Sequence, residues 1–325
     1  MTNRFRLIIP IAAAAVFTLS SSIMSAEIAS DAAGSSPWGP QDEIGSLNMM
    51  TEESRAAILS RVKGGRVFDL GVEYFVGMPD CCSAAFGDPT YQHMMTHVPS
   101  RDGAGEMVSH TSEAISMNTH TGTHIDTLNH FGLHGTIWNG HEAEAELGAR
   151  GWSRSGAEKY PPIVARGVLI DVAGAKGLDI LPPSYSITVQ DLQTALMTQG
   201  TEIEPGDVVL IRTGQMTAWP DRASFNLFQQ SGLGIEAAQW LVESQNVMLL
   251  GADNLGLENF PSPRQDNFAP VHTYLLAEKG VSFIEMIWLE DLAEAGIYEF
   301  AFLTAPLKLR GASGSPLRPM ALPID

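Results

Sequence analysis

Three short apolar runs constrain the fold most, because each has the composition of a strand that is buried on both faces. The runs are residues 166–172 (RGVLIDV), 207–213 (DVVLIRT) and 247–251 (VMLLG). The segments at 188–199 and 235–244, which separate them, have helical patterns. Strands that alternate with helices at this spacing predict an α/β domain.

Weaker patterns extend this alternation along the rest of the chain. Thr51 is positioned to cap a helix whose first turn carries Glu52 and Glu53, and the glycines at 64 and 65 would end it. Further strands are predicted at 66–76, 281–287 and 298–305, further helices at 141–147 and 289–295, a loop at 78–97, and a tail rich in Pro, Gly and Ser. No internal repeat, low-complexity block or linker divides the sequence, so we expect one domain.

Residues 1–26 have the composition of an export signal. Two arginines are followed by an apolar run at 7–19 and then by small residues. This run is too short to span a bilayer, so a cleaved signal peptide is favoured over a retained anchor. We expect cleavage after Ala26, a flexible segment at 27–36 and a folded domain at 37–325. The mature protein would be periplasmic or secreted, without membrane association.

Charge and cysteine content narrow the possible partners. The formal net charge is −18 at pH 7, which argues against nucleic acid or an anionic membrane, because both require a basic surface. The only cysteines, Cys81 and Cys82, are adjacent and would pair only through a strained ring. We therefore expect the hydrophobic core, and not a disulfide framework, to hold the fold.

Residues 117–132 (MNTHTGTHIDTLNHFG) contain the strongest functional signal. His120, His124, Asp126 and His130 lie close together in a chain that has only 9 histidines. These are side chains that bind metals or transfer protons. A polar turn with solvated histidines is the alternative interpretation, but such clustering favours a metal site.

The spacing of these residues constrains the local backbone. Ligand atoms about 2.0–2.2 Å from one ion must lie within roughly 4 Å of each other. On a helix Asp126 would point away from His120 and His124, and on a straight strand the three would span roughly 20 Å. The chain must therefore fold back, and Gly122, which readily adopts positive φ, lies where the bend is needed. We expect a strand that runs into a tight loop.

The sequence HTGTHIDTLNH resembles the H-x-G-T-H-x-D-x-P-x-H signature of the putative cyclase family, which includes bacterial kynurenine formamidases and isatin hydrolases. Leu128 stands where the signature usually has proline. The resemblance covers most of the chain after the signal and fits the longer-chain branch, with WGPQDEIGSLN, GDVVLIRTG, GVSFIEMIWLEDLA and APLKLRGASGSPLRPMA. It implies a single-domain α/β fold of the swivelling β/β/α type with a mixed sheet, assembled as a homodimer or homotetramer.

The resemblance also implies a site for one or two divalent ions, Zn or Mn. The first ion would be held by His120, His124 and Asp126, and Asp126 would be able to bridge to a second ion. The site would be completed by His272 and Glu285. Without the resemblance, His272 would be interpreted as an ordinary, partly buried histidine. Glu285 favours a ligand role independently, because it lies in an apolar strand where an unpaired carboxylate is costly to bury. Histidine and carboxylate ligands without thiolate suit Zn and Mn almost equally.

His130 matches the family's general acid/base. A histidine beside a metal-activated water passes a proton to a leaving nitrogen, and the alternative is a residue that only orients a ligand. The implied activity is that of a metal-dependent hydrolase that cleaves the C–N amide bond of a small cyclic or aryl amide. Two other functions stay open: a metal-dependent cyclase or dehydratase acting on a small carbonyl substrate, and an exported non-catalytic metal- or ligand-binding protein. The last would have no need of His130.

Other positions bear on the substrate without showing which residues bind it. Family enzymes that act on aryl formamides carry a W-P-G-D-like segment after the first strand, whereas Met78–Pro89 has no tryptophan. That difference, together with export, argues against a simple kynurenine formamidase. Asp253 and Asn254 follow a predicted strand, where α/β sites gather, but a structural role is favoured. The remaining histidines are predicted to be solvated or structural: His93, His97, His110, His134 and His141.

Overall fold

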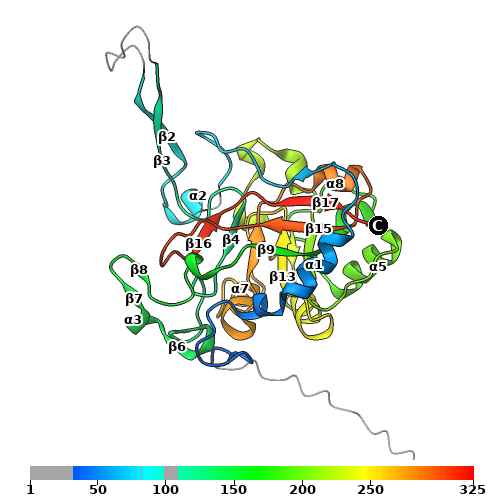
Figure 1. Ribbon diagram of the computed structural model, residues 1–325, viewed down its shortest axis with the longest axis horizontal. Coiled ribbons are helices and arrows are strands. Elements are labelled where there is room, and N and C mark those ends of the chain that lie inside the picture. The colour runs from blue at the N-terminus through cyan, green and yellow to red at the C-terminus, as the bar shows by residue number, and fades with distance from the viewer. Residues whose placement is uncertain (1–31, 81, 99–108) are drawn as a thin grey trace, which may run out of the picture. The chain divides into compact units, whose positions relative to one another are not determined.

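The computed structural model describes residues 32–80, 82–98 and 109–325 (Figure 1). The predicted signal peptide, its cleavage site and Cys81 therefore lie outside the described residues. Within the described ranges, no helix is long and apolar enough to cross a membrane. Gly34 donates a backbone hydrogen bond to the carbonyl of Ala277 (2.8 Å), so the chain is bonded to the domain from within the segment predicted to be flexible.

A nine-stranded mixed sheet forms the centre of the domain, in the order β1-β17-β15-β9-β11-β13-β14-β4-β16. Its central strands are parallel to one another: β9 (Ile163–Asp171), β11 (Val208–Arg212), β13 (Leu249–Ala252) and β14 (Phe283–Glu285). The first three overlap the three apolar runs, and β14 lies within the strand predicted at 281–287. The predicted α/β class with a mixed sheet is confirmed.

Antiparallel strands extend the sheet on both sides. Beyond β9 these are β15 (Glu299–Thr304), β17 (Met320–Pro323) and β1 (Phe68–Asp69), and beyond β14 they are β4 (His124–Asp126) and β16 (Gly314–Pro316). β15 agrees with the strand predicted at 298–305. The Pro-, Gly- and Ser-rich tail supplies β16 and β17, for which no strand was predicted. β16 is an edge strand, where proline is tolerated.

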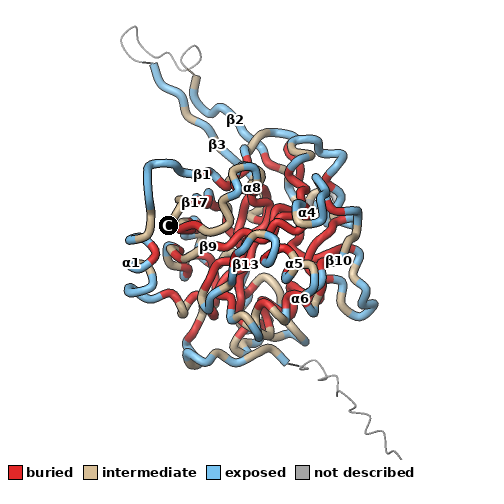
Figure 2. Tube along the Cα trace, turned by 90° about the vertical axis from the view of Figure 1, so that its right-hand side faces the viewer, coloured by how far each residue is buried: buried red, intermediate tan, exposed pale blue. Residues whose placement is uncertain are grey.

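Side chains alternate between two buried faces of the sheet. On β9, Val168 and Ile170 point to one face and Leu169 points to the other. Helices cover the first face with α5 (Val189–Gln199), α6 (Ile235–Gln239) and α7 (Pro270–His272), and the second with η1 (Gly45–Met49), α1 (Glu52–Ser60) and α8 (Glu290–Glu294). Figure 2 shows buried residues concentrated along the central strands. Burial on both faces explains why these strands are apolar without interruption.

The helices agree with prediction in position more than in length. Thr51 caps α1 and Thr188 caps α5, each through a reciprocal capping box. α1 ends at Ser60, before the glycines that were predicted to end it. α6 continues as the π-helix η7 (Trp240–Ser244) and α7 as the π-helix η8 (Thr273–Lys279). The helix predicted at 141–147 is the short α3 (Ala143–Glu146), and that predicted at 289–295 is α8.

The strand predicted at 66–76 is wrong beyond β1. Leu70 and Val72 are buried, as the apolar pattern implies, but their backbone amides bond outside any ladder. The amide of Leu70 donates to the carbonyl of Pro319, and the amide of Val72 donates to the Thr123 hydroxyl. Burial, and not strand pairing, therefore produces the pattern.

The loop predicted at 78–97 is wrong in part. It contains α2 (Cys82–Phe86) and β2 (Gln92–His97), and β2 pairs with β3 (Ser112–Ser116) in a hairpin that extends away from the sheet (Figure 1). Every residue of β2 is exposed. A strand with both faces in solvent has no apolar alternation from which it could be predicted.

Short elements connect these layers, and one of them, η6, reaches the site described below. They are β5 (Thr136–Ile137), η2 (Trp138–Gly140), β6 (His141–Glu142), β7 (Leu147–Gly148), β8 (Gly151–Trp152), η3 (Ala157–Lys159), α4 (Val172–Ala175), β10 (Ser186–Ile187), η4 (Gln215–Ala218), η5 (Arg222–Ser224), η6 (Leu227–Gln229) and β12 (Gly232–Leu233).

Candidate active site

Two adjacent strands bring three of the candidate ligands together. His124 and Asp126 lie on β4 with one residue between them, so their side chains leave the same face of the strand. Glu285 ends β14 and is the direct antiparallel partner of His124. The Nε2 atom of His124 lies 3.4 Å from Asp126 Oδ1 and 3.5 Å from Glu285 Oε2. All three side chains are buried.

The turn before β4 adds His120 to this group. Gly122 has a φ of +63°, so the predicted bend is confirmed, although the strand that carries the ligands follows the turn instead of preceding it. The hydroxyl of Tyr74 lies 2.8 and 2.9 Å from the carbonyl oxygens of the two residues that flank Gly122. The turn places His120 Nδ1 2.7 Å from Asp126 Oδ1.

The closing segment of the chain shapes the space around His120. Ser313 Oγ lies 3.1 Å from His120 Nε2, and β16 runs alongside β4. A Cβ atom at Gly314 would lie 2.5 Å from the His120 ring. Glycine at this position therefore leaves the room that the histidine occupies.

His272 joins the site from α7 and is oriented by a carboxylate that the sequence analysis missed. Its Nε2 atom lies 3.4 Å from Glu285 Oε1, and its Nδ1 atom lies 2.6 Å from Oε1 of the buried Glu258. Glu258 also accepts the backbone amides of His272 (2.9 Å) and Val271 (3.2 Å), which satisfies donors at the start of α7. Glu258 shares the signal that marked Glu285, an acidic residue in an apolar segment (LGLENF).

The structure thus brings all five predicted ligands together in two overlapping sets. In each set the N and O ligand atoms lie within 4.8 Å of one another, and Asp126 belongs to both: His120, His124 and Asp126, and Asp126, His272 and Glu285. Every member is buried. The donors are imidazole and carboxylate without thiolate, a combination that binds divalent metals.

Two buried atoms indicate that a cation belongs here. Among the described residues, His124 Nε2 and Glu285 Oε1 are buried without a hydrogen-bond partner. His124 Nδ1 lies 2.7 Å from the carbonyl oxygen of Gly122, so its N–H donates there and Nε2 keeps a lone pair. Buried polar atoms without partners are destabilising, and coordination of an ion would offset that cost. The residues therefore fit a divalent metal.

The protonation states of the site are strongly coupled. Burial disfavours charge on His272, but the nearby carboxylates of Glu258 and Glu285 outweigh it and raise the pKa of His272 to about 10. Burial also disfavours charge on Asp126, but the nearby rings of His130 and His120 hold the pKa of that carboxyl well below its usual range. A metal that binds here has to displace the His272 proton.

His130 follows β4 and faces the same ligands from the cavity side. Its Nε2 atom lies 3.5 Å from Asp126 Oδ2, and its ring stacks on His120 with centroids 4.0 Å apart and planes at 24°. Burial, reinforced by charge on His120 and His272, lowers the pKa of His130 well below its usual value, against the attraction of Asp126. The imidazole is therefore uncharged at neutral pH.

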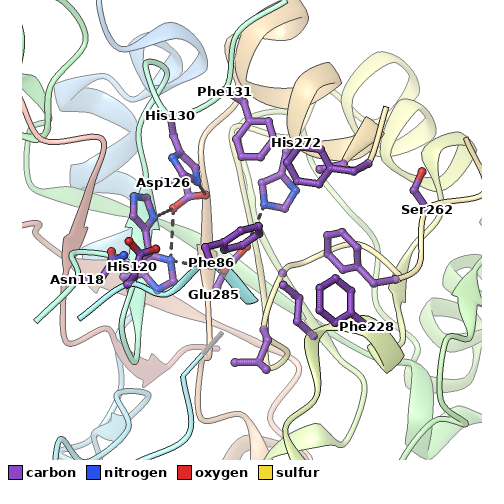
Figure 3. Close-up of a pocket in the computed structure, with 18 of the residues that line it drawn as sticks. Phe86, Asn118, His120, Asp126, His130, Phe131, Phe228, Ser262, His272 and Glu285 are labelled. Atoms are coloured by element: carbon purple, nitrogen blue, oxygen red, sulfur yellow. Dashed lines mark hydrogen bonds and ion pairs between the residues drawn. The ribbon is translucent and has the colours of Figure 1, made fainter. Parts of the chain in front are cut away.

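These side chains form one end of a cavity of about 490 Å³ (Figure 3). Phenylalanines from separate segments line much of the rest: Phe86, Phe131, Phe228, Phe260 and Phe268. Phe86 comes from the segment Met78–Pro89, so that segment supplies an aromatic ring although it lacks tryptophan. Concave, mostly apolar cavities with a few converging polar groups are typical of small-molecule sites. Isolated phenylalanines in loops have no sequence period, which is why these residues were not predicted.

Other candidate positions lie outside this cavity lining. Asp253 accepts backbone hydrogen bonds from Thr213 and the residue after it (both 2.8 Å), and Asn254 donates to the carbonyl of Ser231 (2.6 Å). Both are therefore structural. The five histidines predicted to be solvated or structural do not contribute to the cavity wall as far as the structure describes it.

Leu128 stands where the family signature usually has proline, and its local contacts explain the difference. It is buried, and its amide donates to the hydroxyl of Tyr160 (3.0 Å), which in turn lies 2.7 Å from Ser282 Oγ. Proline has no amide hydrogen and could not form this bond. The difference concerns the turn after β4 and leaves the ligands unchanged.

Comparisons with known proteins agree on the type of fold. A family model described as "Putative cyclase" matches residues 47–259. Cyclase-like protein 3 of Oryza sativa subsp. japonica is 28% identical over 261 residues, which is 78% of this chain and 79% of that protein. A solved structure described as a novel cyclase is 31% identical, with a TM-score of 0.80, and covers 90% of this chain and 99% of that one. Isatin hydrolase A from Labrenzia aggregata bound to benzyl benzoate is 21% identical, with a TM-score of 0.62 over 80% of this chain and 94% of that one, and is similar in fold.

Proposed function

This chain belongs to the putative cyclase family, and from that premise we propose that it is a metal-dependent hydrolase that cleaves the C–N bond of a small cyclic or aryl amide. The observation that carries the proposal is the pair of ligand sets sharing Asp126, with unpaired buried donor atoms beside an aromatic cavity. The fold shared with an isatin hydrolase supports a cyclic amide as one form of the substrate.

Zn or Mn would be held by the residues already named, as one or two ions. His120, His124 and Asp126 would hold one ion, and Asp126 with His272 and Glu285 would hold the other. When bound, a divalent ion lowers the pKa of a water ligand and polarises a carbonyl oxygen. Glu258 would keep the His272 ring oriented through its bond to Nδ1.

His130 would carry the proton of the reaction. Amide hydrolysis requires a base for the attacking water and an acid for the departing nitrogen, and one histidine can serve both steps in turn. Asp126, at 3.5 Å from Nε2, and the stacked ring of His120 hold His130 at the cavity wall. A protein that only stored metal would not need an uncharged histidine beside its ligands, so His130 favours catalysis over the non-catalytic alternative.

The test is a comparison of metal content and hydrolysis in matched variants. The protein is stripped of metal, reloaded with Mn or Zn, and assayed with isatin and formanilide by absorbance. His130→Ala is expected to keep its metal and lose most hydrolysis, about 10²–10⁴-fold, whereas His124→Ala loses metal and activity together. His93→Ala, on the exposed β2, is the control and should change neither. Full activity of His130→Ala would refute the acid/base role, and unchanged metal content in His124→Ala would refute the ligand assignment.

A further inference from the structure

The cavity has an apolar entrance that the reaction itself does not require. Phe86, Phe228 and Phe268 line the cavity and are 59%, 58% and 61% exposed. We call these three residues the phenylalanine rim. They come from α2, from η6 and from the loop before α7, so three separate segments each place one ring at the same opening. Figure 3 shows the rings of Phe86 and Phe228 facing the cavity that His272 and Glu285 also line.

An aromatic wall connects the phenylalanine rim to His130 and His272. The ring of Phe268 lies 5.7 Å from that of Phe131, and Phe131 lies 4.7 Å from His272 and 4.8 Å from His130. These separations are those of interacting aromatic pairs. A substrate whose amide lies beside His130 therefore has a continuous apolar surface along which the rest of the molecule can lie.

Away from the proposed metal ligands, the described part of this aromatic wall offers no cationic side chain to pair with a negative charge. Of the lining residues that the structure describes, none is lysine or arginine, and Asp88 adds a carboxylate. Two arginines that are close in sequence to rim residues lie beside carboxylates: Arg222 lies 3.7 Å from Asp80, and Arg264 lies 2.7 Å from Asp266. An anionic group would lose its hydration here without compensation, and the net charge of −18 repels anions at long range.

We propose that this site takes uncharged aromatic amides that carry a second apolar group, which packs against the phenylalanine rim, and that it discriminates against substrates bearing a carboxylate. The proposal rests on the hydrolase function proposed above and specifies its substrate class. In the reaction, the oxygen of water bonds to the carbonyl carbon, the C–N bond breaks, the nitrogen takes a proton, and the acid formed ionises.

A matched set of ring-substituted probes tests this selectivity. The probes are isatin, 5-phenylisatin, isatin-5-carboxylate and its methyl ester, so that size and charge change separately at one ring position. On the metal-loaded protein we expect kcat/KM for the methyl ester to exceed that for the carboxylate by at least about tenfold. The phenyl group should raise kcat/KM over isatin by about tenfold, the effect of one or two aromatic contacts.

Variants of Phe228 test whether the phenylalanine rim causes this selectivity. Phe228→Ala should reduce the ratio of kcat/KM for 5-phenylisatin to kcat/KM for isatin about fivefold to tenfold. Phe228→Arg should raise kcat/KM for isatin-5-carboxylate relative to that for its methyl ester. Phe228 is mostly exposed, so both substitutions remove little packing. Met197→Ala, which removes a 77% exposed apolar side chain on α5, should leave every ratio unchanged.

The outcomes separate this proposal from the hydrolase function. If the carboxylate is hydrolysed as well as its ester, or if Phe228→Ala leaves the ratio unchanged, the selectivity is refuted while hydrolysis stands. If no probe is hydrolysed, binding of the same four compounds is measured by calorimetry. Preferential binding of 5-phenylisatin would then refute hydrolysis of these cyclic amides and keep the selectivity, and equal or no binding would refute both. If Phe228→Ala changes the particle mass in solution and not the ratio, the rim is an interface between copies and the proposal is overturned.

Discussion

Gly122 is the residue on which the metal site depends for its shape, and replacing it with alanine has a cost that the structure allows us to work out. The residue has a φ of +63°, a conformation that costs an L-residue about 1–2 kcal/mol. A Cβ atom there would lie 2.6 Å from Cζ of Tyr74. Because the Tyr74 hydroxyl is bonded to both flanking carbonyls, the ring cannot withdraw without breaking those contacts.

Relief of the clash adds an overpacking cost of about 1–3 kcal/mol. Gly122→Ala is therefore expected to lower the free energy of unfolding by about 2–5 kcal/mol. The displaced turn should also separate His120 from Asp126 and weaken metal binding. Urea unfolding of the metal-free protein measures the first effect, and metal content after dialysis measures the second.

Gly135→Ala is the matched control for this substitution. Gly135 also has a positive φ, +81°, but a Cβ atom there would meet nothing within 4 Å. This variant should lose only the conformational cost of about 1–2 kcal/mol and keep its metal. Equal destabilisation of the two variants, or full metal content in Gly122→Ala, would show that the close approach of Tyr74 does not shape the site.

Other predictions follow from single contacts. Metal uptake at pH 8 should release at least one proton per chain, because the pKa of His272 is raised to about 10 and a ligating histidine must be neutral. The affinity for metal should therefore rise by about tenfold per pH unit until pH 10. Calorimetry in buffers of different ionisation enthalpy measures both the affinity and the number of protons released. Glu258→Gln should reduce that proton count, since it removes the carboxylate 2.6 Å from His272 Nδ1, and an unchanged count would contradict the coupling. Leu128→Pro, although it restores the family's usual residue, should destabilise the protein by about 2–4 kcal/mol in urea unfolding, because it removes a buried side chain and the bond to Tyr160. If the protein is exported, mass spectrometry of the mature chain should show an N-terminus after Ala26, and an intact N-terminus in the exported fraction would contradict the signal assignment.

The parts of the fold that could be predicted from sequence are those in which burial determines composition. The central strands were found because both faces of each are covered, so that Val168, Leu169 and Ile170 must all be apolar. The same rule misled the prediction at Leu70, which is buried but bonds to Pro319 outside a ladder. The rule does not apply to β2, because every residue of that strand is exposed.

The candidate site, like the fold, could be predicted from sequence only in part. His120, His124 and Asp126 lie within one turn and strand, so their spacing and Gly122 were enough to predict the bend. Glu285 stood out because a carboxylate in an apolar strand requires a partner. Glu258 lies in an equally apolar segment but was not predicted. The phenylalanine rim comes from segments far apart in the sequence, where no local period marks a single ring.

Asp126 belongs to both ligand sets, and elemental analysis of Asp126→Asn shows whether both depend on it. The wild-type protein, reloaded with Mn and freed of excess metal, should retain one or two ions per chain and hydrolyse isatin. Asp126→Asn should retain none and be inactive, because it removes an anionic ligand from both sets, while its circular dichroism spectrum stays that of the folded chain. Retention of the full metal complement by folded Asp126→Asn would show that neither ligand set requires the Asp126 carboxylate.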